Sequence, residues 1–184
     1  MPKVVDHEQK RIEIALNAAE VFLQYGYKNT GMRQLCQHLH MSKSAVYHYF
    51  DSKDAIFRAA TEAMLALDSD ILKSRPLAAN ASLTQRTENF LLLFHHIAPR
   101  FFQEQKLVVE YIEVIGVGNI ATDPCMKQVN QKYLDLLTTY VDEDQGQALF
   151  TLFLGLLNHQ LLMSSELDVS YIEQQLQRIL ASRR

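Results

Sequence analysis

The chain has 184 residues, with 18 Lys or Arg against 21 Asp or Glu, and its formal net charge at pH 7 is −3. It contains only 6 Gly and 4 Pro, which leaves little material for the many turns of an all-β fold. Its 48% hydrophobic and 21% charged residues exclude a disordered or fibrous chain. A globular chain of this length buries roughly 70% of its unfolded surface, so we expect it to fold without disulfides or a structural metal.

Targeting and membrane signals are weak in this sequence. The two cysteines, Cys36 and Cys125, make no disulfide framework and favour a reducing compartment. The first eight residues contain no apolar core typical of a signal peptide. The longest nearly apolar run, 148–157, is about half of what a bilayer span needs. We therefore expect a cytoplasmic protein that does not enter the membrane.

The acidic net charge is unevenly distributed along the chain. Residues 1–65 carry 8 basic and 7 acidic side chains, a net charge of +1, whereas residues 66–184 carry 10 and 14, a net charge of −4. Residues 26–50 contain Lys28, Arg33 and Lys43, three histidines and no acid. Phosphate binding needs Lys and Arg, so this short stretch keeps nucleic-acid binding open, although an ordinary solvated surface would look the same.

Apolar periodicity and capping residues predict helices along the whole chain. Residues 8–25 form an amphipathic pattern that Gly26 closes. Thr30 and Ser42 are candidate N-caps of two short helices, 31–39 and 43–50. The further helices are predicted at about 53–73, from Ser82 to Pro99, from Pro99 to 116, 124–141, 145–163 and 169–181. The prediction is an all-α fold of about nine helices.

The two short helices after an amphipathic helix and before a long one predict a helix-turn-helix domain. At 100° per residue, Val46, Tyr49 and Phe50 lie on one face of helix 43–50, and Ser44, Tyr47 and His48 lie largely opposite. The outward face contains no acid and suits contacts with phosphates and base edges, although a plain polar surface helix would share the pattern. We predict a helix-turn-helix domain at 1–52, a linking helix at about 53–73 and a second helical domain at 74–184.

About residues 10–60, a third of the chain, resemble the TetR family of transcriptional regulators. The resemblance rests on Gly26-Tyr27, Thr30, Arg33, Leu35, the run Met41–Phe50 and the run Ser52–Ile56. Three positions depart from the family pattern: His40 and Ser44 replace glycines, and Cys36 replaces a small alanine. His tolerates a positive φ better than most residues, so we expect the turn at His40 to survive. Cys36 fits a small packed residue, with a redox role as the alternative.

The resemblance implies a regulator that binds a palindromic double-stranded DNA operator as a homodimer and is released by a small hydrophobic ligand, most simply a repressor. The alternative is an activator or architectural DNA-binding protein with no such ligand. The family pattern implies base contacts by Arg33, Lys43, Ser44, Ala45 and His48, and phosphate contacts by Thr30, Ser42, Tyr47 and Lys53. The ligand, the operator and the regulated genes cannot be named from the sequence.

The acidic remainder of the chain contains candidates for a ligand pocket and a dimer interface. Helix 145–163 is apolar around its circumference and helix 169–181 has an apolar seam, which predicts a four-helix dimer contact; the alternative is a central helix of a monomer. The dimer candidates are Phe150, Phe153, Leu154, Leu157, Leu161, Ile172, Leu176 and Ile179. The pocket candidates, which could equally be core residues, are Phe90, Phe94, Ile97, Phe101, Tyr111, Ile115, Tyr133 and Tyr140.

No motif of a catalytic site occurs in the sequence. It contains no Glu-x-x-His, Walker loop, Gly-x-Ser-x-Gly or His-Glu-x-x-His. We expect no enzymatic activity, no cofactor and no bound metal.

Overall fold

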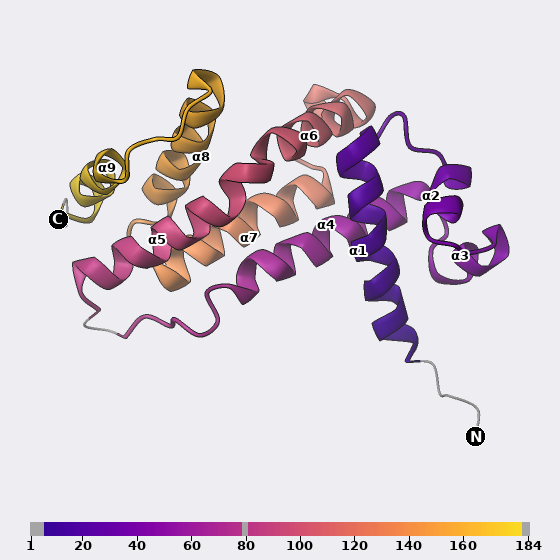
Figure 1. The fold of residues 1–184 in the computed structure, drawn as a ribbon, viewed down its shortest axis with the longest axis horizontal. Helices are drawn as coiled ribbons and strands as arrows, with labels where there is room; N and C mark the ends of the chain where they lie inside the picture. The colour runs from indigo at the N-terminus through magenta and orange to yellow at the C-terminus, as the bar shows by residue number, and fades with distance from the viewer. Residues whose placement is uncertain (1–5, 79–80, 182–184) are drawn as a thin grey trace. The chain divides into compact units, whose positions relative to one another are not determined.

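The computed structural model describes residues 6–78 and 81–181 (Figure 1). These residues form nine α-helices and two short 3-10 helices, η1 and η2, with no strand among them. The elements are α1 His7–Tyr25, α2 Met32–His38, α3 Lys43–Tyr49, α4 Lys53–Asp70, α5 Leu83–Ile97, η1 Ala98–Arg100, α6 Phe101–Ile115, η2 Val117–Asn119, α7 Pro124–Tyr140, α8 Gly146–Met163 and α9 Val169–Ala181. The all-α prediction is confirmed.

Most helix ends lie where capping residues predicted them. Ser42 and Ser82 accept hydrogen bonds from the amides of Ala45 (3.1 Å) and Gln85 (3.2 Å). Gly26 ends α1 at φ 84°, but its ψ of 165° lies outside the left-handed helical region typical of a glycine at a helix end.

Three predicted boundaries were wrong. The N-cap of α2 is Gly31 rather than Thr30. The long helix α4 ends at Asp70, three residues early, because turns replace its last predicted residues. Pro99 lies inside η1, between α5 and α6, rather than in the first turn of α6.

The first of two compact units contains the chain up to Ala66 together with Gln103–Lys127. Its core is built from apolar side chains of α1 to α4, among them Phe22, Leu35, Val46, Phe50 and Ile56, which are at most 1% exposed. Burying each such side chain contributes about 1.5–3 kcal/mol, so the two short helices depend on this packing.

The second unit contains Leu67–Phe102 and the chain from Gln128 onward. Within it α9 packs against both α5 and α8 (Figure 1). Phe90, Phe94, Leu137, Phe153 and Leu176 form the centre of its core.

Two buried carboxylates tie helices of the second unit together. Asp68 pairs with Arg100 and accepts a hydrogen bond of 2.9 Å from the Tyr133 hydroxyl. Asp142 pairs with Arg86 at 2.5 Å, and the side chains of this pair are only 2% and 11% exposed. A buried charge is tolerated only when it is paired in this way.

The two packing units do not coincide with the predicted domains, whose boundaries lie at residues 52 and 74. Helices α4, α6 and α7 each contribute residues to both units. The functional division into a DNA-binding and a ligand-binding domain stays a prediction. Among the described helices, none combines the length and apolar character needed to cross a membrane.

Candidate nucleic-acid interface

The turn between α2 and α3 sets the direction in which α3 leaves the helix pair. The amide of Met41 donates to the carbonyl of Cys36 at 3.0 Å, and His40 adopts φ 51°. His40 therefore adopts the positive φ expected at this position, where the family pattern has a glycine. This conformation costs a non-glycine residue about 1–2 kcal/mol, which the surrounding packing offsets.

Helix α3 presents the two faces that its sequence predicted. Val46 and Phe50 are buried and Tyr49 is half-buried against the core of the first unit. On the other side Lys43, Ser44, Tyr47 and His48 are exposed and Ala45 is half-buried. The exposed face contains no carboxylate, and the buried Val46 and Phe50 anchor the opposite face.

Arg33 on α2 and Lys43 on α3 are brought together by the turn. Both line one shallow pocket of about 420 Å³ in the first unit, with Met32, Cys36 and Met41 forming most of its apolar wall. The Lys43 Nζ also lies 5.6 Å from the centre of the Tyr47 ring, a cation–π contact. Two of the predicted base-contacting side chains therefore share one positively charged surface.

The four residues predicted to contact phosphates differ in how exposed their side chains are. Thr30 is 1% exposed and its hydroxyl donates to the carbonyl of Gly26 at 2.6 Å, so the prediction that it holds a phosphate is wrong. Lys53 is half-buried. Its Nζ donates a hydrogen bond to the Tyr27 carbonyl at 2.9 Å and lies 4.2 Å from the centre of the Tyr27 ring. Ser42 and Tyr47 are exposed at the surface, and their phosphate contacts stay predictions, as does that of Lys53.

Two residues of α1 adjoin this surface and were missed by the sequence reasoning. The ring of His7 lies 5.5 Å from that of His48 and 5.9 Å from that of Tyr49. Arg11 donates to the carbonyl of Tyr49 and stacks on Phe50 at 4.2 Å. Nothing in the local pattern connects α1 with α3, because their proximity arises from the packing of the three-helix core.

The predicted ligand-pocket residues are divided between the two units. Tyr111 belongs to the core of the first unit and Ile115 packs against it. Phe90, Phe94, Ile97 and Phe101 belong to the core of the second unit, and Tyr133 and Tyr140 pack against that core. Phe90 and Phe94 are completely buried, and Ile97 is nearly so. The ligand contacts of these eight residues stay a prediction, and for the fully buried ones the alternative of plain core residues fits their burial.

Four of the predicted dimer contacts also belong to the chain's own interior. Phe153, Leu157, Ile172 and Leu176 are at most 2% exposed, so they have no surface to offer a partner. The prediction is wrong for these four, because they pack into the core that α5, α8 and α9 share within the second unit. For the partly exposed Phe150, Leu154, Leu161 and Ile179 the dimer contact stays a prediction.

Comparison with known proteins agrees with this geometry. Residues 14–60, which contain most of α1, all of α2 and α3 and the start of α4, match the sequence profile described as bacterial regulatory proteins, tetR family. A stretch of 75 residues is 41% identical to the HTH-type transcriptional repressor Rv1474c of Mycobacterium tuberculosis and covers 38% of this chain. Over these N-terminal residues the chain is similar to regulators of the tetR family. It covers only about 40% of the length of the curated relatives it matches.

The likeness in fold to TetR-family structures extends over nearly the whole chain. A family member from Streptomyces coelicolor A3 superposes with a TM-score of 0.68 at 17% identity, covering 95% of this chain and 98% of that one. The multidrug binding protein EbrR gives the same TM-score and identity, covering 95% and 90% of the two chains. At this identity the likeness establishes the fold.

Proposed function

We propose that this chain is a DNA-binding transcriptional repressor of the TetR type that acts as a homodimer and is released from its operator by a small ligand. The observation that carries the proposal is the acid-free, exposed face of α3, held in place by the buried Val46 and Phe50. A helix presented in this way fits the major groove, where base edges are distinguishable.

The individual roles follow from the chemistry of each exposed group. Arg33 and Lys43 are donors suited to the O6 and N7 acceptors of guanine, and His48 and Ser44 can donate or accept at a base edge. Tyr47 and Ser42 carry hydroxyls suited to phosphate oxygens. Because these contacts are few, we expect modest non-specific affinity that falls steeply with salt.

The experiment begins with selection of bound sequences from a random duplex library, followed by titration of the selected operator in a fluorescence anisotropy assay. Lys43→Ala should weaken operator binding about 5- to 150-fold and relax the preference at one base pair, because a good base contact is worth about 1–3 kcal/mol. Tyr47→Ala should weaken selected and random duplexes by the same factor.

The matched control is Lys132→Ala, which removes the same charge from an exposed position on α7. It should leave the affinity unchanged. If Lys43→Ala and Lys132→Ala lowered operator affinity equally, the loss would be explained by net charge alone. That result would contradict the assignment of α3 as the reading helix.

Homodimerisation is supported by the outer face of α8, where Leu154 is half-buried and Leu162 is 82% exposed. Leu154→Arg should shift the chain from dimer to monomer in size-exclusion chromatography. Leu83→Arg, at a 46% exposed leucine on α5, is the matched control and should stay dimeric. A dimeric, stable Leu154→Arg variant would contradict the interface.

Ligand release is supported by what the similar proteins are called: two relatives are named repressors, and EbrR is described as multidrug binding. A thermal-shift screen against a panel of hydrophobic compounds should find at least one that raises Tm and lowers operator affinity. A compound class that raises Tm without changing operator affinity, or no stabilising compound at all, favours the alternative of a regulator without an inducer.

A further inference from the structure

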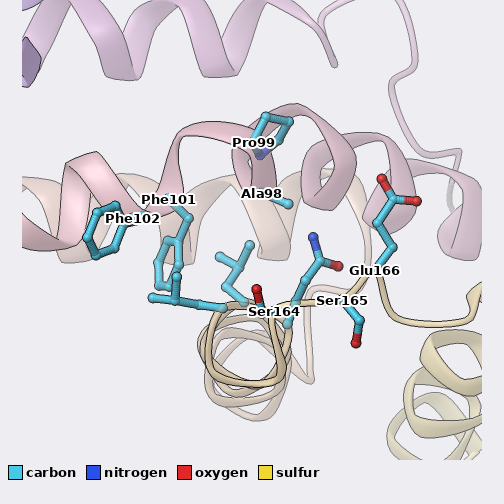
Figure 2. Close-up of a pocket in the computed structure, with 10 residues that line it drawn as sticks. Ala98, Pro99, Phe101, Phe102, Ser164, Ser165 and Glu166 are labelled. Atoms are coloured by element: carbon cyan, nitrogen blue, oxygen red, sulfur yellow. The ribbon is translucent and has the colours of Figure 1, made fainter.

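A pocket of about 310 Å³ opens on the surface of the second unit, largely apart from the residues predicted to bind a ligand (Figure 2). The junction of α5, η1 and α6 forms one wall, and the end of α8 with the residues that follow it forms the other. Of the eight predicted pocket residues only Phe101 lines it. The space equals roughly ten water molecules, or a ligand of about a dozen non-hydrogen atoms.

The two ends of the pocket differ in chemistry. Figure 2 shows the rings of Phe101 and Phe102 at one end and Ser165 with Glu166 at the other. Phe102 is 59% exposed, so a ligand that covers its ring removes apolar surface from water. The pocket is therefore shaped for a molecule with an apolar body and a polar head.

The charges in and around the pocket favour a cationic polar head over an anionic one. Among the described residues that line this pocket, Glu166 is the only charged one, and there is no Lys, Arg or His. Residues 66–184 carry a net charge of −4, so the surrounding field also attracts cations. An anionic head would meet a carboxylate and no counter-charge on the pocket wall.

The wall that carries Glu166 is held in a defined shape. Helix α8 ends at Met163, and Ser164 takes a left-handed conformation with φ 53° that turns the chain. The side-chain carbonyl of Gln160 then accepts a hydrogen bond from the amide of Leu167 at 3.3 Å, which closes the turn around Ser165 and Glu166. This ordered turn fixes where the backbone of Glu166 lies at the edge of the pocket.

We propose that this pocket binds a small lipophilic amine, with the ammonium group at Glu166 and the apolar body against Phe101 and Phe102. The binding of such an amine is independent of the regulatory function proposed above. Its role as the ligand that releases the operator rests on that function. The ammonium gains a charge-assisted contact at the carboxylate, and the body removes exposed aromatic surface from water.

The test compares three probes of nearly equal size by isothermal titration calorimetry with the full chain: 4-phenylbutylamine, 4-phenylbutanol and 4-phenylbutyrate. The amine should bind about tenfold more tightly than the acid, with the alcohol between them, since exposed ion pairs are modest and screened by salt. Glu166→Gln should remove this order by weakening the amine about threefold to fivefold. Phe102→Ala should weaken all three probes alike.

The matched control is Glu143→Gln, which removes one exposed carboxylate from the same unit outside the pocket. It should leave the order of the three probes unchanged. Equal binding of amine and acid to the unmodified chain, equal effects of Glu166→Gln and Glu143→Gln, or no binding of any probe at 10-fold excess over a 1 mM Kd, roughly 10 mM, overturns the proposal. No DNA enters the experiment, so its failure and the failure of DNA binding are separate results.

Discussion

Two arginine–carboxylate pairs in the second unit have the same separation and very different surroundings. Arg86 pairs with Asp142 at 2.5 Å with side chains 11% and 2% exposed. Arg75 pairs with Glu88, also at 2.5 Å, with side chains 38% and 55% exposed. If burial rather than distance determines what an ion pair contributes, removing the two carboxylates should have unequal effects on stability.

The expected magnitudes follow from the contacts. Asp142→Ala leaves the Arg86 guanidinium buried without its counter-charge and also removes the acceptor of the Asp144 and Gln145 amides, at 3.0 and 3.2 Å. Breaking a buried pair from one side costs about 3–5 kcal/mol. Glu88→Ala removes an exposed pair and should cost about 0–1 kcal/mol.

Thermal unfolding followed by circular dichroism measures the difference. For a chain of this size, Tm changes by about 2–4 °C per kcal/mol, so Asp142→Ala should lower Tm by about 6–20 °C and Glu88→Ala by about 4 °C at most. The double variant Arg86→Met with Asp142→Asn should recover part of the loss, because it leaves no unpaired buried charge.

Either of two results would refute this reasoning. Equal Tm losses in Asp142→Ala and Glu88→Ala would mean that burial does not set the cost. A double variant whose loss equals the sum of its two single variants would mean that no unpaired charge was responsible.

Three further predictions concern single side chains. Cys125 is buried, which raises its thiol pKa to about 11, so at pH 8 a thiol reagent should modify the half-exposed Cys36 first and Cys125 only on denaturation; two equal rates would contradict this. Burial also raises the pKa of Tyr27 and Tyr111, so both stay neutral in the folded chain while the unfolded chain ionises above about pH 10. Stability should therefore fall as the pH rises past that value, and replacing both by Phe should leave the 295 nm absorbance of the folded chain at pH 11 unchanged; a lower absorbance would show that they had ionised. At the left-handed position, His40→Val should lower the free energy of unfolding by about 1–2 kcal/mol while His40→Gly should be neutral or stabilising by up to about 1 kcal/mol, with equal denaturant midpoints for the two as the contrary outcome.

The sequence by itself determined the secondary structure and the orientation of α3. Caps such as Ser42 and Ser82 act over three residues, and the 100° step of a helix fixes which side chains share a face. The order of residues along α3 therefore suffices to assign Val46 and Phe50 to the buried side and Tyr47 to the exposed side. These are local properties, and local pattern suffices for them.

The tertiary structure decided which apolar faces were interior and which polar groups were free. Nothing within one turn of helix indicates that Thr30 is buried, or that Phe153 and Ile172 face the chain's own core rather than a partner. The contact between His7 and His48 joins residues 41 positions apart, and the pocket beside Glu166 joins segments about 60 apart. Burial is set by what packs against a face, and that neighbour lies far away in the sequence, so only the folded chain identifies it.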